Sequence, residues 1–209
     1  MKVSFNIKIL LPVLVSIVVA FFITGYVIYS DVFEETEVIA KSDVQNLSYR
    51  YGNVLKSELE KSIKITETLA SAAASFTESS LNRKDVLANI EDVLSKNPQL
   101  FDVWIVWERN KFDQRDNDFK NSVSLGSNEE GQFAPLVYRN GAAIARSHAV
   151  DMYTGGEQSK WYQLPLREGR LNITEPVSYD YDGKSFTTVT ISAPVRVNGQ
   201  IVGVAGVDF

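Results

Sequence analysis

The 209-residue sequence contains no cysteine and a single histidine. The missing thiols exclude disulfide bridges, thiolate zinc sites and a cysteine nucleophile. His148 has no second histidine with which to share a metal ion and lies in a polar stretch, so we expect a surface or pocket-rim imidazole and no metal site. The packed core alone must then hold the fold.

Catalytic motifs are also missing. The chain has no phosphate-binding glycine loop, no G-x-S-x-G and no H-E-x-x-H. The enzymatic alternative is a hydrolase that uses a pair of Asp and Glu residues, which requires two acids facing one cleft. Nothing in the sequence favours that alternative. We therefore predict a protein that is not an enzyme and that carries no cofactor.

Clustered positive charge is missing as well. The net charge is −5 and the charged residues are interspersed. Binding to a phosphate backbone requires a basic patch or stripe, and none is present. We therefore expect no nucleic-acid partner.

One long apolar run is present near the N-terminus. Residues 9–29 carry no charge and are about as long as the ~20 residues that cross a ~30 Å hydrocarbon layer. Lys2 and Lys8 precede the run and several acids follow it, which places the N-terminus in the cytoplasm. A cleaved signal peptide is the competing interpretation, but its apolar core would usually be ~7–15 residues. The sequence predicts an uncleaved transmembrane helix within residues 1–30 and an exported remainder.

A second helical pattern follows the apolar run. Residues 31–80 contain no proline, and apolar residues recur at spacings of three, four or their sums, which predicts a long amphipathic stalk helix. The stripe suits a dimer seam or a face packed against the same chain. A shorter helix is expected over Asp85–Lys96, where Asn97 and Pro98 stop it.

After Pro98 the pattern changes to the period of two that is typical of strands. Residues 101–108 predict a strand with one dry and one mixed face, which puts Trp104 and Trp107 on opposite faces. Further strands are expected over residues 135–139, 142–150, 172–181, 185–197 and 200–208. Three two-residue turns, Asn140-Gly141, Asp182-Gly183 and Asn198-Gly199, indicate hairpins and hence an antiparallel sheet. The expected fold class is α+β.

Three segments together resemble the double Cache sensor domain of bacterial methyl-accepting chemotaxis proteins. The first is Trp107–Asp116, which is similar to the family segment W-E-P-N-x-F-D-G-x-D. The second consists of Trp161–Pro165 and Ile173–Pro176, which are similar to W-Y-x-x-P and E-P-Y. The third consists of Ser192–Val195 and Gly203–Asp208, which are similar to a P-I strand and to G-V-x-G-V-D. The resemblance implies that residues 81–209 form the membrane-distal, PAS-like ligand-binding module. It also implies a bacterial inner-membrane chemoreceptor with its sensor in the periplasm and a homodimer through the stalk helix.

The resemblance implies further parts as well. The family continues with a membrane-proximal module, a second transmembrane helix, a HAMP segment and a signalling coiled coil, and none of these follows Phe209. We therefore expect an N-terminal fragment. The same sensor module also precedes histidine kinases and diguanylate cyclases, so these outputs stay as alternatives.

The resemblance also implies ligand-binding residues. In the amino-acid-binding branch an arginine two positions before the Trp-Tyr pair grips the ligand carboxylate, and here that position is Ser159, followed by Lys160. The residues expected to bind a ligand are Tyr153, Trp161, Tyr162, Tyr179 and Asp208. For Asp113, Arg115 and Asp116 we favour an ion-pair lattice that fixes their loop.

The chemistry of these residues suggests a ligand class. A carboxylate at the end of a buried strand needs a partner, and beside aromatic faces Asp208 suits an ammonium group. We therefore expect an amine or a quaternary ammonium compound. A purine, an amino acid, or no ligand at all in a structural dimerisation module are the alternatives.

Overall fold

The computed structural model describes residues 5–181 and 184–209, and it divides the chain into two compact units, 1–56 and 57–209. Helix α1 (Phe5–Glu78) begins in the first unit and continues into the second, so the predicted span and stalk are one helix, as expected. An apolar window of α1 near the N-terminus has a mean hydropathy of 2.5, and its side chains are all exposed. By length and composition, α1 is long and apolar enough to cross a membrane.

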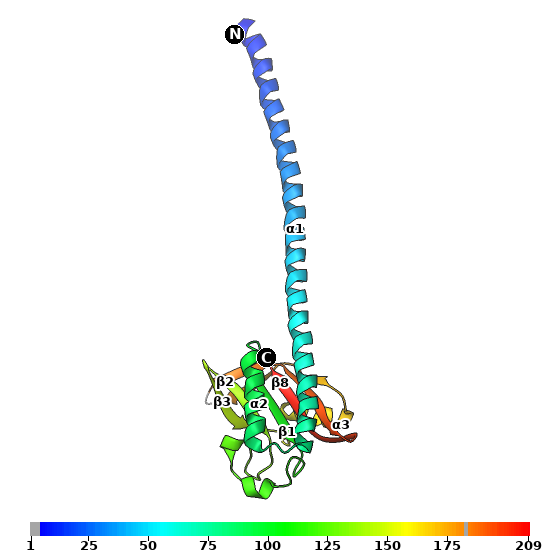
Figure 1. The fold of residues 1–209 in the computed structure, drawn as a ribbon. Helices are drawn as coiled ribbons and strands as arrows, with labels where there is room; N and C mark the ends of the chain where they lie inside the picture. The colour runs from blue at the N-terminus through cyan, green and yellow to red at the C-terminus, as the bar shows by residue number, and fades with distance from the viewer. Residues whose placement is uncertain (1–4, 182–183) are drawn as a thin grey trace. The chain divides into compact units, whose positions relative to one another are not determined.

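The second unit begins with the end of α1 and with helix α2 (Arg83–Lys96). Asn82 caps α2 because its side chain accepts from the Asp85 backbone N–H, while the Asp85 carboxylate accepts from the Asn82 N–H. This capping box starts the helix two residues earlier than predicted. Both helices pack on one face of a sheet (Figure 1).

The sheet has six strands in the order β3-β2-β1-β8-β7-β4, and all pairs are antiparallel, as predicted. Their bounds are β1 (Asp102–Trp107), β2 (Pro135–Asn140), β3 (Ala143–His148), β4 (Asn172–Ile173), β7 (Thr190–Val197) and β8 (Gln200–Asp208). A separate two-stranded sheet pairs β5 (Val177–Tyr181) with β6 (Lys184–Thr188). The central pair, β1 with β8, joins the first and last strands of the module.

Two predicted strands were too long. The strand expected over residues 172–181 is divided into β4 and β5, since Pro176 has no N–H to give to a ladder. The strand expected over residues 185–197 is divided at Val189, whose backbone pairs with Phe209 instead. The sequence therefore showed the extended segments but not their division between two sheets.

Of the three predicted turns, one is confirmed, one is shifted by one position and one lies outside the described residues. Asn198 and Gly199 both have positive φ, 50° and 79°, which confirms the predicted hairpin between β7 and β8. Asn140 pairs with Ala143, so the β2–β3 turn consists of residues 141–142, one position later than predicted. The turn expected at Asp182-Gly183 lies outside the described residues.

The two faces of β1 are both dry, whereas one mixed face was expected. All six residues are buried. Val103, Ile105 and Trp107 pack against α1 and α2, while Trp104 and Val106 pack against a second apolar group on the opposite face. This second face is covered by residues 149–152 and by helix α3 (Lys160–Glu168), which was not predicted. By alternation, Asp102 lies on the face of Trp104.

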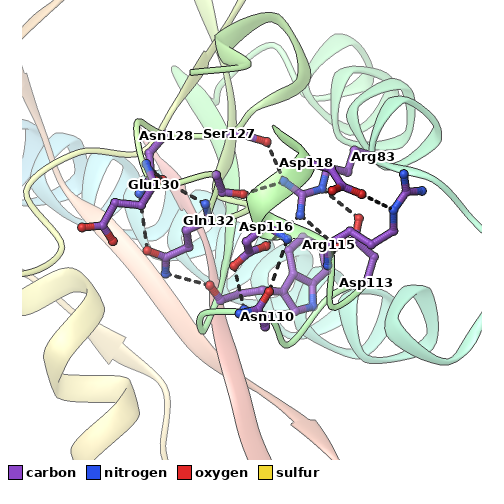
Figure 2. A network of polar contacts seen from close by, with 12 residues as sticks. Arg83, Asn110, Asp113, Arg115, Asp116, Asp118, Ser127, Asn128, Glu130 and Gln132 are labelled. Carbon is purple, nitrogen blue, oxygen red and sulfur yellow. Dashed lines mark hydrogen bonds and ion pairs between the residues drawn. The ribbon is translucent and has the colours of Figure 1, made fainter. Parts of the chain in front are cut away.

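Arg83 organises the loop that follows β1 (Figure 2). The buried guanidinium donates to both carboxylate oxygens of Asp113 at 2.9 and 2.8 Å and to Asp116 at 2.7 Å. It also donates to the Ser127 hydroxyl and to the Gly131 carbonyl oxygen. Burial would raise the pKa of Asp113, but these bonds to Arg83 lower it below its usual value.

Ion pairs therefore do fix this loop, with a different cation from the one expected. Arg115 pairs with Asp118 on the surface, and only its backbone N–H reaches Asp113. Gln114 has a φ of 59° at the position where the resembling segment carries glycine. The central partner, Arg83, is thirty residues away in the sequence and was missed.

Candidate ligand-binding site

A cavity of about 20 Å³ lies on the second face of the sheet, between β1, β8 and the segments that cover them. Its lining residues are Trp104, Leu136, Ala149, Val150, Trp161, Tyr179, Thr190 and Asp208. Three of the predicted ligand residues, Trp161, Tyr179 and Asp208, are therefore brought together. In the described structure the cavity has room for a water molecule.

Two indole rings form the aromatic wall. The Trp104 and Trp161 ring centroids are 4.5 Å apart at an interplanar angle of 71°, an edge-to-face contact. Trp104 lies opposite Gly206 in the β1–β8 pair, and a Cβ atom at Gly206 would lie 2.2 Å from the Trp104 ring. The glycine in the G-V-D ending thus makes room for the indole that walls the cavity.

Asp208 brings a buried carboxyl group to the cavity. Its pKa is raised to about 6 by burial, although the neighbouring polar groups of Thr190, Asp102 and Trp104 act in the opposite direction. One of its carboxylate oxygens, Oδ1, is buried without a hydrogen-bond partner among the described residues. This acid therefore retains an unmet demand for a donor.

A second acid, Asp102, lies beside it. Asp102 and Asp208 are direct Cα partners across β1 and β8, and both are buried. Burial and the neighbouring Asp208 charge raise the pKa of Asp102 well above its usual value. A proton held by either carboxyl group removes the repulsion between them, so the two acids titrate as a pair.

The two other predicted residues lie elsewhere. The Tyr162 ring is buried and its hydroxyl donates to Glu108; burial and that carboxylate raise the pKa of Tyr162. Tyr153 is 52% exposed, and its hydroxyl accepts from Gln132 Nε2 at 2.9 Å. Its ring meets the Tyr162 ring edge-on at 5.7 Å. Neither side chain lines the cavity of Asp208.

Tyr153 instead lines an open hollow of about 450 Å³ with residues that include Arg109, Glu130 and His148. The segment from Ala149 to Tyr153 separates this hollow from the cavity, since Ala149 and Val150 line both. His148 is half-buried at the rim, in line with the expectation from sequence. Burial lowers the pKa of His148.

Ser159, at the position of the family's carboxylate-binding arginine, is buried at the start of α3, outside the cavity lining. Lys160 is on the surface, paired with Glu157. Among the described residues, the cavity lining thus contains acid and aromatic groups and no cationic side chain. In the part of the chain that the structure describes, no group of three His, Cys, Asp or Glu residues could hold a metal ion.

Sequence reasoning missed Asp102, and it considered Trp104 only as a core residue. The signal for Asp102 was an acid inside a strand whose other residues are apolar or aromatic. Because the facing strand was unknown, that acid was assigned to a mixed, partly wet face. Its pairing with Asp208 requires the β1–β8 register, which joins residues more than a hundred positions apart.

Two helices on one face of an antiparallel sheet, with a small cavity of aromatic, aliphatic and acidic lining on the other, define the architecture of a PAS-like sensor module. Residues 86–209 match the family of methyl-accepting chemotaxis protein-like, first PDC sensor domains. The chain belongs to this family. This confirms the resemblance to chemoreceptor sensor domains and the α+β fold.

Individual relatives agree with the family. The methyl-accepting chemotaxis protein TlpQ of Pseudomonas aeruginosa is 24% identical over 136 residues, 61% of this chain and 19% of TlpQ. The extracellular domain of mmHK1S-Z2, described as a histidine kinase, is 30% identical with a TM-score of 0.65, covering 76% of this chain and 56% of that one. A structure of methyl-accepting chemotaxis protein X has a TM-score of 0.72 at 20% identity, covering 84% and 64%. The chain thus spans under two thirds of each relative.

Proposed function

We propose that this chain is the extracytoplasmic sensing module of a transmembrane chemoreceptor and that it binds a small organic cation, an amine or a quaternary ammonium compound. The observation that carries the proposal is the cavity in which Asp208 meets Trp104, Trp161 and Tyr179 without a cationic side chain among its lining residues. Buried carboxylates in proteins are normally paired with a cation or a strong donor. A ligand ammonium group supplies that partner.

The aromatic lining supports the same ligand class. A cation over an indole or phenol face gains roughly 0.5–2 kcal/mol, more where water is excluded. A charge-assisted hydrogen bond to Asp208 adds to this. The absence of arginine at position 159 disfavours an α-amino acid, because nothing at that position would hold the ligand carboxylate.

Binding requires the cavity to enlarge. In the described structure it has room for about one water molecule, which is too little for an organic amine. We expect the segment from Ala149 to Tyr153 to move when the cavity enlarges, because Val150 and Tyr153 are exposed and Asp151 has a φ of 61°. Ligand binding would then stabilise an outward position of this segment and bias one arrangement of the module over another.

The proposal also assigns roles to the apolar start of α1 and to the stalk that follows it in the same helix. The apolar start of α1 would place the module outside the inner membrane in a single pass. The exposed apolar side chains Val44, Leu47, Tyr51, Val54 and Leu55 would form a homodimer seam along the stalk. The output class has a second candidate, a histidine kinase, which the 30% identity to mmHK1S-Z2 favours.

The test is a thermal-shift screen of the full chain in lipid nanodiscs, because a ligand that binds only the native state raises its Tm with concentration. Ethanolamine and choline should raise the Tm, whereas adenine and alanine should not. Asp208→Asn should remove the shift, and the surface variant Asp92→Asn should keep it. An equal shift for wild type and Asp208→Asn, or a shift with adenine alone, contradicts the ammonium assignment.

A further inference from the structure

We propose that Asp102 and Asp208 act as one proton-exchanging unit that selects ammonium groups bearing N–H donors over quaternary ammonium groups. This inference rests on the proposed function and narrows it. It assigns a specificity-determining role to Asp102, a residue that the family resemblance did not single out.

The geometry of the pair is the first step. Asp102 and Asp208 are Cα partners on the cavity face, and neither side chain is solvent-exposed. Both oxygens of Asp102 and Oδ1 of Asp208 are buried without a hydrogen-bond partner among the described residues. Three buried acceptor atoms at one point of the sheet therefore await donors.

The neighbouring groups do not supply a cation. Among the described residues, the groups near the pair are Trp104 from β1, Thr190 from β7 and Tyr179 from β5, and the Asp151 charge in turn acts on Tyr179. On the other side of β1, Tyr138 of β2 lies opposite Asp102 in the sheet. Nearby charge is thus negative or neutral, and in the free protein a shared proton reduces the repulsion of the two acids.

The second step is the exchange itself. A primary ammonium ion that enters between the two carboxyl groups brings one positive charge and three N–H donors. The shared proton then leaves to solvent, so the site exchanges one positive charge for another and both acids become ionised. No bond other than the O–H bond of the protonated carboxyl group breaks. Binding therefore releases a proton.

The third step is selectivity. A quaternary ammonium ion has the same charge but no N–H, so it cannot satisfy the carboxylate oxygens that lose the shared proton. Buried acceptors without donors are costly, whereas an exposed site would tolerate either cation. The Asp102–Asp208 pair, here called the dyad, therefore favours primary over quaternary ammonium groups. The indole rings attract both kinds of cation.

The experiment is isothermal titration calorimetry of the full chain in nanodiscs with ethanolamine, N,N-dimethylethanolamine and choline. These three cations share a carbon skeleton and lose N–H donors in turn. We expect affinity to fall along the series, by about tenfold or more from ethanolamine to choline. Titrations in buffers of different ionisation enthalpy near pH 6 should show that ethanolamine releases a proton.

Asp102→Asn removes the exchange but keeps the shape of the side chain. It should abolish proton release and reduce the ratio of ethanolamine to choline affinity, while Asp92→Asn on α2 behaves as wild type. Proton release is read on the wild type, so the proposal remains testable if Asp102→Asn does not fold. Equal affinity for ethanolamine and choline, or binding without proton release, overturns the dyad and leaves the cation sensor intact. No binding by any of the three overturns the proposed function itself.

Discussion

Asp102 and Asp208 face each other across β1 and β8; burial raises the pKa of both carboxyl groups, and the neighbouring Asp208 charge raises that of Asp102 further. An acid with a raised folded-state pKa stabilises the fold below its unfolded-state pKa and loses that contribution as the pH rises through the folded-state value. For Asp208 that window runs from about 4 to about 6. Ionisation of both acids above this window leaves two buried negative charges side by side, which destabilises the fold.

The first prediction concerns this destabilisation. Asp102→Asn removes one of two repelling charges, so it should raise the free energy of unfolding at pH 8 by on the order of 1–3 kcal/mol. The gain should shrink toward pH 5, below the pKa of about 6 at Asp208, where a proton on that acid removes the repulsion. Thermal unfolding at both pH values measures it. The lowered pKa of His148 acts in the opposite direction in both proteins and cancels in the difference. A uniform loss of stability at both pH values would contradict the dyad.

The second prediction concerns Gly206. Gly206→Ala places a methyl group in the Trp104 ring, so the indole must move away from the cavity wall. We expect a loss of about 1–3 kcal/mol from overpacking and a weaker response to ethanolamine. Gly52→Ala is the control for the absence of a clash, because a Cβ atom there meets nothing within 4 Å; it should preserve binding without lowering the Tm, since alanine favours a helix interior over glycine. Fluorescence of the tryptophans would report the displaced ring.

The third prediction concerns Arg83. Arg83→Met leaves Asp113 and Asp116 without their buried cation, and breaking a buried pair in this way costs about 3–5 kcal/mol. Hydrogen exchange should increase across residues 109–132. Arg115→Gln, which breaks only a surface pair, should cost about 1 kcal/mol or less. Similar losses in the two variants would show that Arg83 does not hold this loop.

The fourth prediction separates Tyr162 from Trp161. Tyr162→Phe removes the hydroxyl that donates to Glu108 and should cost about 1–2 kcal/mol of stability. Because Tyr162 does not line the cavity, the Tyr162→Phe variant should bind ethanolamine with an affinity within about twofold of wild type. Trp161→Phe alters the cavity wall and should weaken binding more. A large loss of ethanolamine affinity in Tyr162→Phe would show that Tyr162 takes part in ligand binding.

Local patterns explain which elements could be predicted. The strand within residues 101–108 and the Asn198-Gly199 turn depend on neighbours in sequence, and both appear in the structure, although the face of the strand that was expected to be mixed is buried. The break at Pro176 is also local, but a strand can run on either side of a proline, so the pattern did not show that two sheets begin there. Helix α3 escaped prediction because it is nine residues long and contains Pro165.

The candidate site was predictable only in part. Trp161 and Asp208 were found through motif resemblance, Tyr179 was expected as an aromatic wall, and all three share one cavity. Tyr162 belongs to the same motif as Trp161, and Tyr153 was expected near it, yet they lie in the core and in a different hollow. Motif spacing places residues on one loop or helix, but it does not determine which side of that element faces the sheet.

The apolar run, the helical stripe, the strand period and the lack of thiols sufficed to derive a helix able to span a membrane, a stalk and an antiparallel α+β module, because each depends on chemistry repeated along a short stretch of chain. Tertiary contacts decided the rest. Asp102 meets Asp208, and Arg83 meets Asp113, only after strands and helices distant in sequence pack together. Asp102 and Asp208 then form a buried pair of acids without a cation among the described residues, whereas the buried guanidinium of Arg83 forms a hydrogen-bonded ion pair with Asp113.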